Sequence, residues 1–165
     1  MAKQDKTPPE NSGVHLWLLL WKATKAVEAQ ARGSVEASGL CLSDFGVLEA
    51  LLHKGPLPVS ALGRKVLLSS GSMTAAVDRL ERSGLVERAS AATDRRSRIV
   101  HLTEKGRSLI RPVFAEHARD MERVFSLLET PERDALVSLL RKLGREAEAM
   151  AAGEEKPVEN EQRRR

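Results

Sequence analysis

One predicted helix carries the side chains whose types and spacing are best suited to chemistry. It begins at Ser70, whose hydroxyl can cap the first turn, and it ends before Gly84. Met73, Val77 and Leu80 recur at helical spacing and define an inward face. The opposite face is small and polar at first and basic further on; it consists of Ser72, Ala75, Arg79 and Arg82. Small residues near the N-terminus allow a helix to enter the major groove of duplex DNA, which is about 12 Å wide.

The polar groups of this helix are suited to contacts with phosphates or base edges. The hydroxyls of Ser70, Ser72 and Thr74 can hydrogen-bond to either, and the helix N-terminus attracts phosphate. Ala75 leaves room for close approach, and the guanidinium of Arg79 suits a guanine edge or the DNA backbone. We therefore predict that these five residues contact double-stranded DNA.

A second basic group follows in a polar loop, which reads Asp94-Arg95-Arg96-Ser97-Arg98. Three arginines at a hairpin tip have no evident use in folding, and guanidinium groups suit the negative potential of the narrow minor groove. Asp94 either orients Arg96 through a bidentate ion pair or simply favours the bend. Because this loop follows the helix just described, we prefer the interpretation in which Asp94 orients Arg96 for DNA. Asp94, Arg95, Arg96 and Arg98 are therefore predicted to bind DNA.

The elements that position these groups follow from hydrophobic spacing. Helices are predicted over about residues 14–36, 43–53, 60–66, 70–83, 104–129 and 131–152, with strands near 85–88 and 98–102. Three short helices in tandem followed by a hairpin are typical of a winged helix-turn-helix unit. The predicted fold class is mainly α with a small β-hairpin wing, flanked by N- and C-terminal dimerisation helices.

The predicted domain layout places the DNA-binding unit between helical arms. Residues 1–12 form a flexible leader, 13–38 and 104–152 a helical dimerisation region, 39–103 the winged domain, and 153–165 a disordered charged tail. A helix-turn-helix protein reaches two half-sites one DNA turn apart as a dimer. The arms carry more apolar surface than the winged unit needs, so a homodimer is expected. A rival arrangement packs all the helices within one monomer.

Composition excludes several classes of protein. The 165 residues are 41% hydrophobic but only 3% aromatic, without tyrosine, which argues against stacking platforms for single-stranded nucleic acid. The single cysteine excludes an internal disulfide and multi-cysteine zinc fingers. No common catalytic motif is present, so we expect no enzyme, no cofactor and no metal. The segment 79–111 carries nine Lys and Arg against four Asp and Glu, whereas the remainder is nearly neutral, which favours a polyanionic partner.

The apolar run from Val14 to Trp21 is too short to cross a membrane, because a span needs about 20 apolar residues and Lys22 interrupts this one. A signal peptide is disfavoured by Asp5 and Glu10 in the leader. We expect no membrane association and a cytoplasmic location.

The strings SSGSMTAAVDRLERSGLVER and DRRSRIVHLTEKG resemble the recognition helix and wing of the MarR (multiple antibiotic resistance regulator) family. The segment GLCLSDFGVLEALLHKGPLPVSALGRKVLL resembles the preceding two helices, and the resemblance extends over residues 14–152. It implies a homodimeric winged helix-turn-helix regulator, expected to be a repressor, that binds a pseudopalindromic operator and is released by a small aromatic or phenolic ligand or an oxidant. It also matches Asp94 and Arg96 to the wing aspartate and the minor-groove arginine of the family. Many members have arginine where this chain has Ala75, so the operator is expected to differ from theirs.

The resemblance also suggests where an effector would bind. The candidates, for each of which an ordinary core role is the simpler interpretation, are Trp17, Trp21, Phe45, His53 and Phe114. The two tryptophans could alternatively be dimer contacts. Cys41 is a candidate redox residue, although an unreactive thiol is the simpler interpretation. The alternative to a DNA-binding regulator is a winged-helix protein-interaction module without specific DNA binding.

Overall fold

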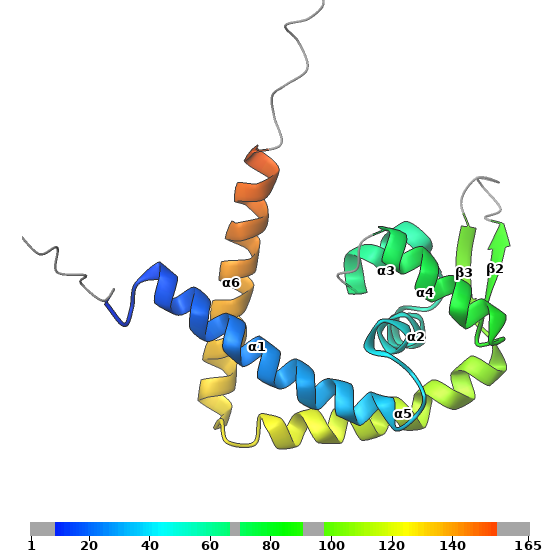
Figure 1. Ribbon diagram of the computed structural model, residues 1–165, viewed down its shortest axis with the longest axis horizontal. Helices are drawn as coiled ribbons and strands as arrows, with labels where there is room; N and C mark the ends of the chain where they lie inside the picture. The colour runs from blue at the N-terminus through cyan, green and yellow to red at the C-terminus, as the bar shows by residue number, and fades with distance from the viewer. Residues whose placement is uncertain (1–8, 67–69, 91–97, 155–165) are drawn as a thin grey trace, which may run out of the picture. The chain divides into compact units, whose positions relative to one another are not determined.

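The computed structural model describes residues 9–66, 70–90 and 98–154 (Figure 1). In chain order the elements are α1 (Gly13–Glu36), α2 (Leu42–Lys54), β1 (Leu57–Pro58), α3 (Val59–Val66), α4 (Ser70–Arg82), β2 (Val86–Ser90), β3 (Arg98–Leu102), α5 (Glu104–Val124) and α6 (Thr130–Glu154). The predicted fold class, mainly helical with a small β-hairpin, is confirmed. The chain forms two compact units, with the boundary between Val124 and Phe125.

Helices α2, α3 and α4 pack on one another as the helix-turn-helix unit, and the β2–β3 hairpin follows α4 (Figure 1). The sheet has three antiparallel strands in the order β1-β3-β2. Strand β1 was not predicted, since the sequence suggested only that Pro58 precedes the third helix. In the structure Leu57 pairs with Val100, and Pro58 pairs with Ile99. Two residues are too few for a periodic pattern, and an edge strand tolerates a proline that lacks an N–H group.

The core of the first unit draws on all five of its helices and on the sheet. Side chains with 0% exposure include Val35, Val47, Leu48, Leu62, Val100 and Ile110. On α4, Met73 and Val77 are 0% exposed and Leu80 is 2% exposed, so the predicted inward face is confirmed. Each such side chain contributes roughly 1.5–3 kcal/mol to stability through burial. This burial fixes the rotation of α4 about its own axis and therefore directs its polar face outward.

Helices α1 and α5 pack along each other and are joined by a polar contact. The Oγ of Ser34 lies 2.7 Å from Nδ1 of His117. The same hydroxyl lies 2.9 Å from the carbonyl of Ala31, to which it can donate. The ring of His117 also contacts Phe45 at a centroid distance of 4.7 Å. His117 thus connects α1, α2 and α5.

The fifth helix is shorter than predicted: α5 ends at Val124, not near Glu129. The backbone turns over residues 125–128, where the side chain of Arg133 donates hydrogen bonds to the carbonyls of Phe125 at 2.9 Å and Leu128 at 3.1 Å. Glu132 accepts a hydrogen bond from the backbone N–H of Glu129 at 2.8 Å and so caps the start of α6. At its other end α6 continues through residues 153 and 154, which the sequence assigned to the disordered tail. The rest of that tail lies outside the described residues.

Candidate DNA-binding surface

The outward face of α4 presents the residue types predicted for DNA contact. Ser72, Thr74, Ala75 and Arg79 are all exposed, while the intervening Ala76 is buried. Ser70 is the first residue of α4, and its side chain lies outside the described part of the chain. The exposed face is thus small and hydroxyl-bearing over its first turns and basic at its C-terminal end, where Arg82 is also exposed. This combination permits close approach of a polyanion to the helix N-terminus.

Arg79 is held by a carboxylate that the sequence did not single out. Its Nη2 lies 2.6 Å from Oδ1 of Asp44, and its Nε donates to Oδ2 at 3.3 Å. Nη2 also lies 3.3 Å from Oγ of Ser43. The hydrogen bond with Asp44 raises the pKa of the Arg79 guanidinium above its ordinary value, so it remains charged at any physiological pH. The pair fixes the side chain of Arg79 against the start of α2 and sets the direction in which its remaining edge points.

Asp44 itself is buried and lies in the first turn of α2. A carboxylate at this position is stabilised by the helix dipole as well as by its ion pair. The only local signal for it is an acidic residue near a helix start, which normally indicates capping. Nothing in the sequence connects it with a residue 35 positions further on, which explains why its role was missed.

A second ion-pair cluster connects α4 to the wing. The guanidinium of Arg88 on β2 contacts Asp78 at 2.5 Å and also pairs with Glu81, and the backbone N–H of Arg88 donates to Glu81 at 3.1 Å. Burial alone would lower the pKa of Arg88, but the hydrogen bonds with Asp78 and Glu81 outweigh it and raise that pKa. Arg88 is 19% exposed, while Asp78 and Glu81 are 50% and 39% exposed, so this cluster links the recognition helix to the hairpin at a partly solvated surface.

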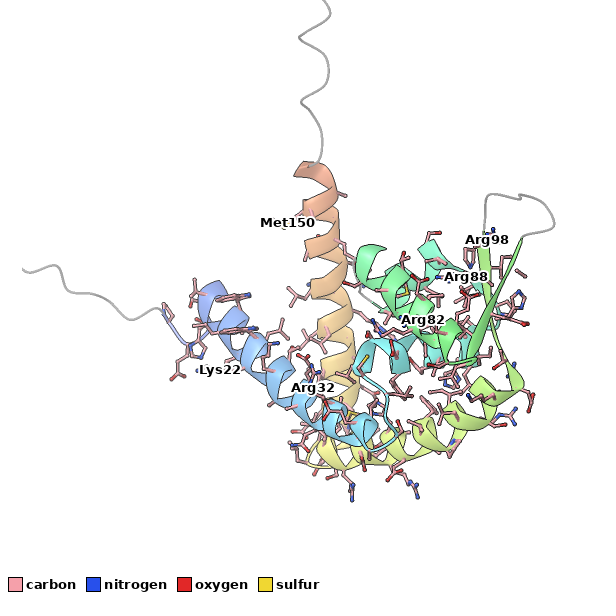
Figure 2. All side chains as sticks on the ribbon, turned by 45° about the vertical axis from the view of Figure 1, so that its right-hand side comes forward. Lys22, Arg32, Arg82, Arg88, Arg98 and Met150 are labelled. Carbon is pink, nitrogen blue, oxygen red and sulfur yellow. The ribbon has the colours of Figure 1, made fainter. Side chains whose placement is uncertain are left out.

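The wing is described up to the base of its tip. β2 and β3 pair from Val86 opposite Leu102 to Ser90 opposite Arg98, and Arg98 is exposed. Asp94, Arg95 and Arg96 lie outside the described residues. Figure 2 shows Arg82, Arg88 and Arg98 in the winged unit, on α4, β2 and β3 respectively.

The effector candidates form separate pairs of rings. Trp17 and Trp21 stack at a centroid distance of 5.9 Å with 5° between their planes, and they are 60% and 52% exposed. His53 on α2 meets Phe114 on α5 edge-on at 4.5 Å, while Phe45 contacts His117. Phe45 is buried, as an ordinary core residue would be. Within the described residues, no ring contact joins a tryptophan to the rings of α2 and α5.

The first unit contains one cleft between α1 and α5 and another beside α2 and α3. A polar cleft of about 490 Å³ runs between α1 and α5 and is lined by Gln30, Gly33, Ser34, Ala37, Glu116, Asp120, Arg123 and Val124. A second cleft of about 430 Å³ lies beside α2 and α3, with His53, Lys54 and Glu49 among its lining residues. Only His53 of the aromatic candidates borders either cleft, as far as the described residues show.

Cys41 is exposed and occupies the N-cap position of α2, where its side chain makes no capping hydrogen bond. Its Sγ lies 3.0 Å from Oγ of Ser43 and 3.8 Å from Nη2 of Arg79. The thiol therefore borders the Arg79–Asp44 pair. In the described part of the chain, His, Cys, Asp and Glu residues form no cluster of three or more suited to a metal ion.

Known proteins are similar to this chain in sequence and in fold. A family model described as "MarR family" matches residues 38–97. The HTH-type transcriptional regulator MhqR of Bacillus subtilis (strain 168) is 35% identical over 129 residues, which cover 78% of this chain and 89% of the relative. BpsR of Bordetella bronchiseptica, solved in a study of the regulation of its DNA binding by 6-hydroxynicotinic acid, aligns with a TM-score of 0.71 and 26% identity over 78% of this chain and 98% of its own. A mutant MarR from E. coli in complex with operator DNA has a TM-score of 0.73 over 83% of this chain and 99% of its own; at 21% identity it shows the fold alone.

The outward polar helix, the attached hairpin and these relatives define a winged helix-turn-helix transcription regulator that binds DNA and is not an enzyme. The chain belongs to the MarR family. The family membership favours DNA binding over the alternative of a pure protein-interaction module. No helix within the described ranges is sufficiently long and apolar to span a membrane.

Proposed function

We propose that this protein is a cytoplasmic repressor that binds a pseudopalindromic operator as a homodimer and is released by a small aromatic or phenolic ligand or by an oxidant. The observation that carries the proposal is the exposed face of α4, with Ser72, Thr74 and Ala75 outward and Met73 and Val77 fully buried. A helix that is rigidly seated by its apolar face and outwardly small and polar is suited to the major groove.

The direct DNA contacts divide between the two grooves. Ser70, Ser72, Thr74, Ala75 and Arg79 would approach the major groove from α4. The wing residues Asp94, Arg95, Arg96 and Arg98 would reach the minor groove, where a narrow width strengthens the attraction for guanidinium. Arg79 would present the edge of its guanidinium that does not bind Asp44, so Asp44 acts as a positioning residue for it.

The homodimer is supported by apolar surface on α1 and, separately, on α6. On α1, the large side chains Leu16, Trp17, Leu19 and Trp21 are 51–60% exposed. On α6, Leu139 is 65% exposed and Leu143 is 52% exposed. Apolar side chains in such runs mark interaction surfaces. A second copy of the chain is the natural occupant, because a two-fold dimer supplies the two α4 helices that a pseudopalindrome requires.

We place the aromatic effector near His53, Phe114 and Phe45. The edge-on contact between His53 and Phe114 joins α2 to α5. A ligand that separates these two rings would therefore alter the position of the winged unit on α5. The regulation of BpsR by 6-hydroxynicotinic acid supports an effector of small aromatic type. Trp17 and Trp21 lie on the exposed apolar face of α1, where a second copy would cover them. For an oxidant, Cys41 offers the target thiol, since it is the one cysteine of the chain.

The test is selection of bound duplexes from a random pool by the purified protein. The proposal predicts an enriched pseudopalindrome with half-site centres about 10 base pairs apart. Repeating the selection with small phenols or a peroxide should abolish enrichment in at least one condition. Enrichment of a single unpaired half-site would contradict the dimer, and the absence of any enriched sequence would contradict specific regulation.

A further inference from the structure

The end of the recognition helix is fastened to the start of α5 by the sequence Thr103-Glu104-Lys105-Gly106. Helix α4 ends at Arg82, and the turn that follows contains Gly84, whose φ of 69° is the left-handed conformation that glycine adopts without strain. The backbone N–H of Leu85 donates to the carbonyl of Leu80 at 2.9 Å, and that of Gly84 donates to the carbonyl of Glu81 at 2.9 Å. These two bonds form a Schellman motif, which defines the geometry of the turn that leaves α4.

Thr103 connects this turn to α5. Its Oγ1 donates to the carbonyl of Gly84 at 2.8 Å and accepts from the backbone N–H of Gly106 at 3.0 Å. Its own backbone N–H donates to the carbonyl of Leu85 at 3.2 Å. The hydroxyl therefore caps α5 and binds the end of α4 at the same time.

Lys105 and Gly106 complete the contact. Nζ of Lys105 donates to the carbonyl of Ser83 at 2.8 Å. Gly106 is buried, and a Cβ added to it would lie 2.0 Å from the carbonyl oxygen of Leu85 and 2.9 Å from the carbonyl carbon. Because both atoms belong to the backbone, any side chain at position 106 would force the two segments apart. The first turn of α5 and the turn after α4 thus touch backbone to backbone.

We propose that Thr103, Lys105 and Gly106 are positioning residues that form a rigid joint between α4 and α5, and that this joint sets the half-site spacing of the operator. The inference rests on the proposed homodimer, in which α5 belongs to the dimerisation region. In a two-fold dimer the separation of the two recognition helices depends on the angle between each α4 and the frame that joins the subunits. Three hydrogen bonds and one backbone contact, all close to the C-terminal end of α4, hold that angle.

This role differs from direct DNA contact in what it predicts. A residue that touches DNA alters the preference for bases or the overall affinity. A residue of the joint alters which spacing is preferred, because it changes where the second α4 meets the duplex. Base preference within one half-site depends on the outward face of α4, so a change in the joint leaves that preference unaltered.

The experiment measures binding of the full chain to a series of duplexes that carry the selected half-sites at spacings changed by one base pair at a time. Thr103→Val removes both hydroxyl hydrogen bonds with little change in volume, and Gly106→Ala separates the two turns. Each should reduce the discrimination between the best spacing and its neighbours by about tenfold, which is about the specificity carried by one base pair. Affinity for a duplex with one half-site should remain that of the wild type.

Three further variants keep the test decisive. Lys105→Met removes only the hydrogen bond to the carbonyl of Ser83, and the side chain is exposed, so this variant should fold. Its discrimination between spacings should fall less than that of Thr103→Val. Thr103→Ser retains the hydroxyl and should restore the spacing preference. Gly153→Ala is the matched control, since nothing lies within 4 Å of its added Cβ and the residue lies outside the predicted dimerisation region. Unchanged spacing discrimination in Thr103→Val and Lys105→Met would overturn the joint alone, whereas a wild-type protein indifferent to spacing would overturn the homodimer proposal together with it.

Discussion

Arg79 on the recognition helix and Asp44 in the first turn of α2 form a forked ion pair, with 2.6 Å between Nη2 and Oδ1. The carboxylate is buried, whereas the guanidinium is 43% exposed. One side of Arg79 is therefore committed to the protein and the other faces outward. This geometry orients an arginine before any ligand arrives, which reduces the entropy lost on binding.

The first prediction concerns this pair. Arg79→Ala should weaken operator binding by about 1–3 kcal/mol, the usual cost of losing an arginine contact to DNA. Asp44→Asn should have a similar effect because Arg79 loses its orientation. Anisotropy titrations of both variants and of the double variant would measure it. The double variant should bind no more weakly than either single one, and additive losses would show that Asp44 does not act through Arg79.

The second prediction concerns the wing. Arg96→Ala should weaken operator binding by about 1–3 kcal/mol and leave the thermal unfolding midpoint unchanged, because the side chain is assigned to DNA and not to the fold. Arg119→Ala, which removes an exposed arginine from α5, serves as the charge-matched control. Equal affinities for Arg96→Ala and wild type would remove this arginine from the mechanism.

The third prediction concerns Arg88, which binds Asp78 and Glu81. Arg88→Met should lower the free energy of unfolding by about 1–3 kcal/mol, since two carboxylates lose their partner. The folded-state pKa of Arg88 is raised, so its contribution is fully present below the unfolded pKa and disappears only as pH rises through the folded value. Urea denaturation of both proteins should therefore give the same difference at neutral and mildly alkaline pH. A difference that vanishes by mildly alkaline pH would contradict this assignment.

The fourth prediction concerns the dimer. Leu20→Glu places a charge on the apolar face of α1 and should shift the protein from dimer to monomer in sedimentation. The only tryptophans, Trp17 and Trp21, lie on either side of it along the helix, so their emission should move to longer wavelength on dissociation. Lys22→Glu, also on α1, should leave both signals unchanged; Figure 2 shows where Lys22 lies. A wild-type protein that sediments as a monomer would exclude the interface.

The fifth prediction concerns Cys41. Alkylation of its thiol adds bulk 3.8 Å from Nη2 of Arg79 and should weaken operator binding by about 1 kcal/mol, the value of one displaced hydrogen bond. Cys41→Ser should bind DNA normally and ignore the reagent. Equal sensitivity of the two proteins would mean that the reagent acts elsewhere.

Local periodicity accounts for what could be predicted from the sequence. Met73, Val77 and Leu80 repeat at helical spacing, so the inward face of α4 and the polar face opposite it could both be predicted. The hairpin was predicted because a polar loop separates two apolar runs. The residues 98–102 that were predicted as the second strand are those of β3.

Contacts between distant segments account for what could not be predicted. Asp44 is recognisable as the partner of Arg79 only when α2 and α4 are packed together. Strand β1 exists because Leu57 pairs with Val100, 43 residues away. The early end of α5 depends on the side chain of Arg133, which binds carbonyls of the preceding turn. Gly106 ends the string DRRSRIVHLTEKG, but its close approach to the carbonyl of Leu85 depends on packing between distant segments and could not be predicted.

The most direct test of the central claim, that α4 and the wing form a paired DNA-binding surface in a homodimer, is an anisotropy titration at physiological salt. The selected duplex and a scrambled duplex of equal length would be compared under the same conditions. The account predicts two protomers per selected duplex and a preference over the scrambled one of about a thousandfold or more. Equal binding of both duplexes, or saturation at one protomer per duplex, would contradict it.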